Sequence, residues 1–170
     1  MIHPEFPELG DVVYLEHAHR GPLPERSRRA VVDALALAAR GVSGKTALQD
    51  AAAEGCGRLP GLLGVVSTTL HFTQNTTSGL AEVAAGIDWR PGDRVVTTEA
   101  EWPSAIDVWR RPGVQVDVLP VRKKDDRIDH DLLRHAMKGA RVVSLGAVCL
   151  ATGERRDLGL YSGMAHREGA

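Results

Sequence analysis

The chain has few cysteines, no long apolar run and no leader-like start, and each shortage excludes a class of protein. Its two cysteines, Cys56 and Cys149, lie far apart and match no metal-ligand spacing. This excludes a disulfide framework and indicates a reducing compartment. No apolar stretch approaches the length of a membrane span. Residues 1–7 lack the basic and apolar segments of a signal peptide, so we expect a cytoplasmic protein with no membrane partner.

An excess of charge of one sign is also missing. The chain has 21 basic and 22 acidic side chains and a net charge of −1. A surface that binds duplex nucleic acid needs a clear basic excess. The mixed run Arg-Lys-Lys-Asp-Asp-Arg at 122–127 is typical of a solvated loop rather than of a phosphate track. We therefore expect no nucleic acid partner.

What is present is a regular alternation of apolar segments and turn signals, in a chain of 170 residues that is long enough to bury a core. The pattern predicts helices over 24–40, 46–64, 77–85, 104–110, 129–138 and 157–167, with Ser104 and Asp129 capping the fourth and fifth and Pro60 kinking or breaking the second. It predicts strands over 12–15, within 65–72, and over 94–98, 114–121 and 141–145, the last buried on both faces. This order predicts an α/β fold in three layers, a mostly parallel sheet with helices on both faces. We expect an arm, a strand and helices over 1–64, and the larger α/β part over 65–170.

Small polar residues open the helix expected at 77–85. The run Asn75-Thr76-Thr77-Ser78-Gly79 lies between a strand and a helix, where unpaired backbone N–H groups and the helix dipole favour an anion. The hydroxyl groups add donors, and Gly79 lets the backbone come close to a ligand. The alternative is an ordinary helix cap made of small polar residues. The spacing leaves both interpretations open.

Aromatic residues are scarce, which makes the position of Trp102 informative. The chain has only two phenylalanines, two tyrosines and three tryptophans. Trp102 follows the strand expected at 94–98, and ligands of open parallel sheets bind beyond the carboxyl ends of strands. A tryptophan face there could stack on a flat, electron-poor ring. The alternative is a core or interface aromatic.

Five pieces of the sequence, in order, resemble one family. They are Tyr14–Pro24 with its Gly-Pro-Leu-Pro turn, Asn75-Thr76-Thr77, the Trp-Arg-Pro-Gly-Asp turn at 89–93, Glu101-Trp102-Pro103-Ser104, and Thr152–Leu158 with its Thr-Gly-x-x-x-Asp-Leu pattern. Together they resemble the amino-terminal portion of the class V aminotransferase family. These are pyridoxal-phosphate enzymes of fold type I that include cysteine desulfurases and isopenicillin-epimerase-like proteins.

The resemblance implies a role for several residues. Thr76 and Thr77 would hold the phosphate of pyridoxal phosphate, and Trp102 would stack on its ring. His17, His19 and Gly21 would line the substrate side. Residues 65–170 would form a truncated cofactor-binding large domain. Family members dimerise, so a homodimer is implied.

The resemblance also implies that catalytic groups are missing. The family's reactive lysine, and the aspartate that pairs with the pyridinium nitrogen, fall beyond Ala170. We expect no catalytic residue in this chain, because the resemblance places its lysines, Lys45, Lys123, Lys124 and Lys138, away from the ring. Leu150 stands where the family often has asparagine.

The implied function is transamination, racemisation or C–S cleavage of an amino acid or amine, with a complementary chain supplying the missing half. The alternative is a non-catalytic remnant or regulatory subunit that pairs with a related protein, and a third is an unrelated module that binds a phosphorylated metabolite.

Three other residue patterns carry weaker signals. His17 and His19 have metal-like His-x-His spacing, but no third ligand is evident, so we expect no metal site. Cys149 follows a strand near the proposed ring, although a cysteine is usually a small buried hydrophobe. Glu101 has the chemistry of an acid–base group, and a solvated loop carboxylate is the interpretation we favour for it.

Overall fold

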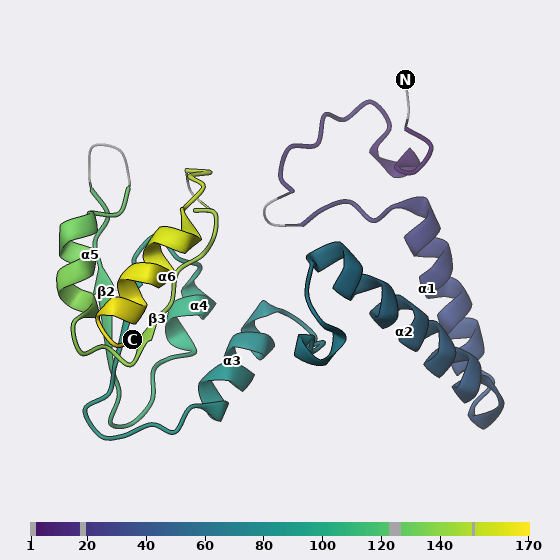
Figure 1. Cartoon of the computed structure of the whole chain (residues 1–170). Helices are drawn as coiled ribbons and strands as arrows, with labels where there is room; N and C mark the ends of the chain where they lie inside the picture. Colours follow the sequence, from purple (N-terminus) through teal and green to yellow (C-terminus); the bar gives the residue numbers. More distant parts are fainter. Residues whose placement is uncertain (1–2, 18–19, 123–126, 151) are drawn as a thin grey trace. The chain divides into compact units, whose positions relative to one another are not determined.

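The computed structural model describes residues 3–17, 20–122, 127–150 and 152–170. It divides into two compact units, Met1–His71 and Phe72–Ala170. Figure 1 shows the course of the chain through both. Compactness alone does not establish independent folding, so the domain boundary expected at residue 64 stays a prediction. No helix in the described part of the chain is both long and apolar enough to cross a membrane.

The first unit is built on two helices, α1 (Glu25–Ala38) and α2 (Val42–Leu63). Two short 3-10 turns, η1 (Pro7–Leu9) and η2 (Ser67–Thr69), flank them. Gly44 of α2 lies against the backbone of α1, because an added Cβ there would be only 1.9 Å from the carbonyl oxygen of Leu37. A side chain at position 44 would therefore push α1 and α2 apart.

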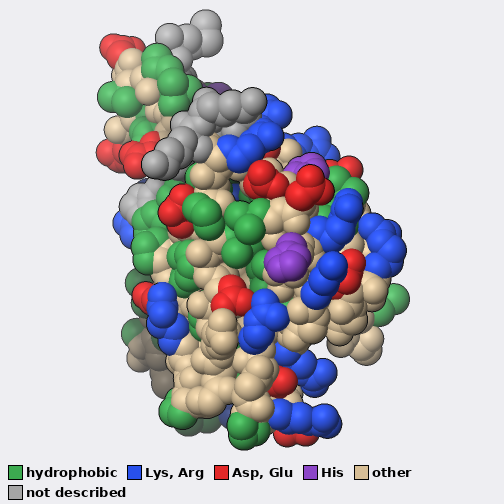
Figure 2. Space-filling view, turned by 90° about the vertical axis from the view of Figure 1, so that its left-hand side faces the viewer, with side chains coloured by type: hydrophobic (Ala, Val, Ile, Leu, Met, Phe, Trp, Pro, Cys, Tyr) green, Lys and Arg blue, Asp and Glu red, His purple; other side chains and the backbone are tan. Residues whose placement is uncertain are grey.

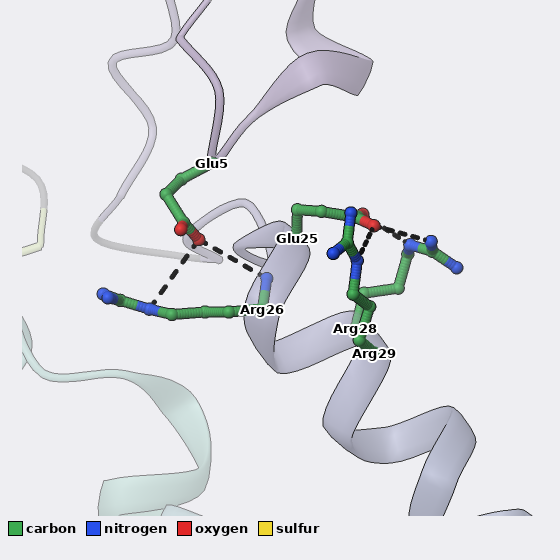
Figure 3. Close-up of polar contacts among 5 residues, drawn as sticks. All are labelled: Glu5, Glu25, Arg26, Arg28 and Arg29. Carbon is green, nitrogen blue, oxygen red and sulfur yellow. Dashed lines mark hydrogen bonds and ion pairs between the residues drawn. The ribbon is translucent and has the colours of Figure 1, made fainter.

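Polar contacts fix the start of α1 (Figure 3). The Glu25 carboxylate accepts hydrogen bonds from Nε of Arg28 and from Nε of Arg29, both at 2.7 Å. These two guanidinium groups lower the pKa of Glu25 to about 2. The Glu5 carboxylate accepts the N–H of Arg26 at 3.4 Å and lies 3.7 Å from its Nε. The segment before α1 is thus tied to the first turn of the helix.

Helix α2 runs through Pro60, where the sequence led us to expect a kink or break. Proline removes one N–H and crowds the preceding turn, but only three residues of helix follow it. The helix then ends at Gly64, whose backbone is left-handed, and the N–H of Val65 donates to the Pro60 carbonyl. Helix α2 is therefore ended by the glycine cap at Gly64 and not by Pro60.

The second unit contains a parallel sheet of three strands, β1 (Arg94–Thr98), β2 (Gln115–Leu119) and β3 (Val142–Val143), in the order β2-β1-β3. Its helices are α3 (Thr76–Gly86), α4 (Pro103–Asp107), α5 (His130–Met137) and α6 (Leu158–Arg167). Strands that run parallel need crossover connections, and the helices supply them. Helices α5 and α6 lie side by side in Figure 1.

Two apolar clusters lie on opposite faces of the sheet. On one face Val96 packs with buried residues of α5 and α6, among them Leu133, Met137 and Met164. Val95, the neighbour of Val96 in β1, packs instead with Ala84 of α3 and with Trp109. Successive strand residues point to opposite faces, so the sheet is covered on both. The predicted three-layer α/β fold with a parallel sheet is confirmed.

An arginine clamps the amino end of β1. Nη2 of Arg94 lies 2.7 Å from a carboxylate oxygen of Asp117 in β2, and Nη1 donates to the carbonyl of Lys138 at 3.0 Å. The same side chain donates to the carbonyl of Ala136 at 2.8 Å. The last turn of α5 is thus held against the amino edge of the sheet, the edge opposite to the one where ligands of open parallel sheets bind.

Charged side chains of both signs are interspersed on the face seen in Figure 2. Neither sign gathers into a continuous tract there.

The structure corrects four local expectations. Residues 12–15 form no strand, and 65–72 contain the turn η2 instead of one, because no described strand pairs with either segment. The strand expected at 141–145 is reduced to Val142–Val143 and is half-buried rather than buried on both faces. Ser104 lies inside α4, whose N-cap residue is Trp102. Strands need partners, and a sequence pattern does not supply them.

Candidate functional site

The start of α3 has the features of an anion site. Asn75 caps the helix, and its side-chain oxygen accepts the N–H of Ser78 at 2.8 Å. The N–H of Gly79 donates to the Asn75 carbonyl at 3.1 Å. Among the described residues, the N–H groups of Thr76 and Thr77 have no backbone acceptor. The first turn therefore presents two unused donors together with the positive end of the helix dipole.

Gly79 has a packing role that the sequence did not indicate. A Cβ added there would lie 3.1 Å from the hydroxyl oxygen of Thr73. The absence of a side chain thus lets Thr73 approach the helix, and the hydroxyl of Thr73 in turn donates to the Asn75 carbonyl at 3.1 Å. This contact shapes the turn that leads into the helix.

Trp102 lies just past the carboxyl end of β1, as the sequence predicts. It is the N-cap residue of α4, with Pro103 at the first helical position. Its side chain is 50% exposed, so one part of the indole is accessible to a ligand. A core aromatic would be buried, as Trp109 is. The exposure favours a role in binding or in an interface.

A hydrogen bond joins the two candidate regions. The hydroxyl of Thr77 donates to the hydroxyl of Ser104 at 3.0 Å, between the first turn of α3 and α4. Since Ser104 lies two residues after Trp102, the helix start and the aromatic residue belong to one edge of the sheet. Sequence reasoning named Thr77 and Trp102 separately, and the structure brings their segments together.

The side chain of Glu101 is largely removed from solvent, where we expected a solvated loop carboxylate. Its side chain is 9% exposed and forms an ion pair with Arg156, whose side chain is 1% exposed. The carboxylate also accepts the N–H of Gly146 at 3.0 Å and the hydroxyl of Thr98 at 3.3 Å. Glu101 thereby ties the end of β1 to the loop after β3 and to the residue before the α6 cap. With both oxygens occupied, it is suited to holding the Trp102 turn in place.

The sequence pattern did not identify this ion pair. A glutamate before Trp102 and an arginine in the run Glu154-Arg155-Arg156 read equally well as exposed charges. Position gave only a weak signal, because Glu101 follows a predicted strand closely whereas Arg156 lies just before the last predicted helix. Charged residues are rarely fully buried unless they are paired, and the pairing here spans distant parts of the chain.

Cys149 is buried, in line with the small-hydrophobe interpretation. Its N–H donates to the carbonyl of Glu154, and its carbonyl accepts the N–H of Gly153, both at 2.9 Å. An antiparallel bridge between Val148 and Arg155 closes the same loop. A buried thiol in a tight loop is poorly placed to react as a nucleophile.

The residues expected on the substrate side lie in the first unit. His17 stacks edge-on with Tyr14 at 5.1 Å between ring centroids, and a Cβ at Gly21 would come within 4.0 Å of the His17 ring. His19 lies outside the described residues. The described residues contain no cluster of three or more His, Cys, Asp or Glu side chains arranged to hold a metal ion.

The described lysines lie away from the carboxyl edge or in the other unit. Lys138 follows α5, and its carbonyl is bound by Arg94 at the amino end of β1, the end opposite to Trp102. Lys45 lies in α2 of the first unit. Lys123 and Lys124 fall outside the described residues.

Comparison with known proteins identifies the family. The model of the family "Aminotransferase class-V" matches residues 36–170. The "probable cysteine desulfurase" of Methanothermobacter thermautotrophicus is 29% identical over 181 aligned positions, which cover 98% of this chain and 44% of that protein.

Solved structures share the fold. The enzyme C-DES, in a form with glycine covalently linked to its PLP cofactor, matches with a TM-score of 0.84 at 24% identity over 96% of this chain. A cysteine desulfurase from Escherichia coli matches with a TM-score of 0.75 at 26% identity over 97% of this chain. In each case the chain spans 45% of the length of the solved protein. With the family match covering well over half of its residues, the chain belongs to the aminotransferase class-V family.

Proposed function

We propose that this chain is the cofactor-binding part of a pyridoxal-phosphate-dependent enzyme that acts on an amino acid or an amine. The Thr77–Ser104 hydrogen bond carries the proposal. It holds a helix start with unused N–H donors beside the turn that presents the half-exposed Trp102. N–H groups that can bind a phosphate and an indole face that can stack on a ring thus lie on one edge of the sheet. A phosphorylated pyridine requires both.

Each residue of this edge has a proposed task. The N–H groups of Thr76 and Thr77 and the hydroxyl of Thr76 bind the phosphate, while the Thr77 hydroxyl holds the helix start to Ser104. Trp102 stacks on the ring and excludes water from one of its faces. Pyridoxal phosphate itself supplies an electron sink for charge that develops on the substrate. Glu101 acts through the turn it holds, because hydrogen bonds to Gly146, Thr98 and Arg156 occupy its oxygens.

The substrate side is proposed from the first unit. His17, His19 and Gly21 would line it, with His17 oriented by its contact to Tyr14. Among transamination, racemisation and C–S cleavage, the names of the relatives favour C–S cleavage of a sulfur amino acid, since they are desulfurases and a cystine C–S lyase. That reaction is our leading candidate.

The lysine that reacts with the cofactor is proposed to come from another segment. Lys138 lies at the wrong end of the sheet. The relatives are more than twice as long as the part that this chain matches. We propose that a complementary chain, or a second subunit, supplies the lysine.

Phosphate binding at α3 is tested by equilibrium dialysis of the purified chain against pyridoxal phosphate and, in parallel, pyridoxal without the phosphate. We expect tighter binding of the phosphorylated form. Thr77→Val should weaken pyridoxal phosphate binding by about ten-fold, because it removes the hydrogen bond to Ser104 that holds the phosphate donors beside Trp102, and such a bond contributes roughly 0.5–1.5 kcal/mol. Binding of pyridoxal should change little.

The matched control is Thr77→Ser, which keeps the hydroxyl and should bind pyridoxal phosphate like the original chain. Circular dichroism verifies that both variants are folded. If pyridoxal and pyridoxal phosphate bind equally, or if Thr77→Val binds both as before, the phosphate site is assigned wrongly.

A regulatory or non-catalytic role is the second candidate. It is favoured by the observation that Lys138, the described lysine of the second unit, lies at the end of the sheet opposite to Trp102. Addition of a complementary family half discriminates between the two. Turnover of cysteine by the assembled complex supports the enzyme, whereas assembly without turnover supports the regulatory subunit.

A further inference from the structure

The outer edge of β3 is built like an interior strand. Its sequence neighbourhood, Val142-Val143-Ser144-Leu145, has the near-continuous apolar character of a strand buried between two neighbours. Within the described residues, however, β3 pairs only with β1. Val142 belongs to the α3 face and Val143 to the α6 face, and both are only half-buried.

A groove runs along this edge. It has a volume of about 660 Å³, and mainly apolar groups line it, including Val83 and Ile87 on one side and Leu158 and Tyr161 on the other. The first pair belongs to α3 and its cap, and the second to α6. Helices on both faces thus flank an unpaired strand edge, which is the setting that a further strand occupies in an α/β sheet.

A second hollow extends the groove toward the candidate site. It measures about 630 Å³, is lined by Ala147, Val148 and residues 155–159, and shares Leu158 and Gly159 with the first. At its wall Arg156 keeps Nε and Nη2 buried and without an acceptor among the described residues. A buried donor without an acceptor is costly. This edge therefore has unused hydrogen-bond donors as well as uncovered apolar side chains.

We propose that these two hollows, called the edge groove from here on, bind an apolar β-strand from the carboxy-terminal half of a class-V aminotransferase chain. The proposal deepens the proposed function and rests on it. More than half the length of the solved relatives has no counterpart in this chain. A strand added beside β3 gains backbone hydrogen bonds along the edge and buries apolar side chains against α3 and α6.

A second copy of this chain fits the edge groove less well. Pairing β3 with its copy would bring a second α3 and a second α6 to the same edge. Four helices would then compete for the two faces of one strand pair. A single extended segment, with typical strands of about five or six residues, meets no such obstacle.

The test co-expresses this chain with the part of the Methanothermobacter thermautotrophicus relative that lies beyond the match, and, in a second arm, with the same part of the Escherichia coli cysteine desulfurase. Native mass spectrometry should detect a 1:1 complex in at least one arm. Hydrogen exchange over residues 141–148 should slow by about ten-fold or more in that complex, since new strand bonds protect amides.

Two variants of α6 supply the matched comparison. Leu158 and Leu160 are 49% and 41% exposed, but only Leu158 lines the edge groove. A glutamate suits the first turn of a helix, so Leu158→Glu and Leu160→Glu should both fold. We expect Leu158→Glu to weaken the complex about ten-fold or more and Leu160→Glu to leave it unchanged.

Three outcomes would overturn the proposal: no complex in either arm, protection that spares 141–148, or equal effects of the two variants. A homodimer protected at 141–148 would identify a second copy as the occupant and refute it too. Equilibrium dialysis against pyridoxal phosphate on the same samples tests the proposed function separately. A chain that binds the cofactor but no carboxy-terminal half refutes strand binding at the edge groove and leaves the proposed function standing.

Discussion

At the scale of single residues, the Glu101–Arg156 pair is the feature on which the candidate site depends most. It is buried at the carboxyl edge and linked to Thr98 and Gly146. Removing one member of a buried pair leaves a charge in a poor environment, which costs roughly 3–5 kcal/mol. Pairs on the surface contribute about 0–1 kcal/mol.

Arg156→Met should therefore lower the free energy of unfolding by about 3 kcal/mol in urea denaturation. Arg110→Met is the control, because Arg110 pairs with Asp107 on the surface and its loss should cost little. The tryptophan fluorescence of Arg156→Met should also shift, since the turn that carries Trp102 loses its anchor. Equal effects of the two substitutions would mean that the buried pair contributes nothing specific.

Residue patterns predicted the positions of Thr76, Thr77 and Trp102, but not the pairs that hold them. The helix start at Asn75 is a local signal, because the five residues from Asn75 to Gly79 are enough to indicate it. The Thr77–Ser104 bond and the Glu101–Arg156 pair join segments that lie far apart in sequence. Such contacts depend on the assembled sheet, and one sequence does not reveal which of its many charges will meet.

At the scale of elements, the contact between α1 and α2 includes one position, Gly44, that has no room for a side chain. An added Cβ at Gly44 meets the backbone of Leu37, whereas one at Gly55 of the same helix meets nothing within 4 Å. Alanine otherwise favours a helix over glycine by about 0.5–1 kcal/mol.

Gly55→Ala should consequently raise stability by about 0.5–1 kcal/mol, whereas Gly44→Ala should lower it by about 1–3 kcal/mol, the usual cost of overpacking. Thermal unfolding followed by circular dichroism measures both. A stabilising Gly44→Ala would show that the helices separate at no cost.

Elements with strong local signals were predicted well, and elements that need partners were not. Strand β1 was predicted at its observed bounds, α5 begins after the expected cap Asp129, and α6 begins within one residue of its predicted start. The strands expected at 12–15 and 65–72 are absent, and β3 is short. Apolar periodicity indicates that a segment can be a strand, but only a neighbouring strand makes it one.

At the scale of the whole molecule, the second unit holds both apolar clusters and the parallel sheet. The first unit leaves large apolar side chains exposed, among them Leu15, Val42 and Leu62. Hydrophobic burial is the main source of stability, so the second unit should be the sturdier one.

A fragment of residues 72–170 should accordingly fold alone. Its amide NMR spectrum should overlay that of the same residues in the full chain, and limited proteolysis should cut first before residue 72. A fragment with a collapsed, poorly dispersed spectrum would show that the first unit is required for the second to fold.

The sheet order also dictates a sequence of assembly. Strand β1 pairs with β2 across a short crossover and with β3 across a connection more than twice as long, which costs roughly 0.9 kcal/mol more in chain entropy. During synthesis β1 and β2 therefore meet first, and β3 closes the sheet only as its residues leave the ribosome. In a nascent chain the sheet therefore forms outward from its central strand β1, and β3 is the last of these three strands to join.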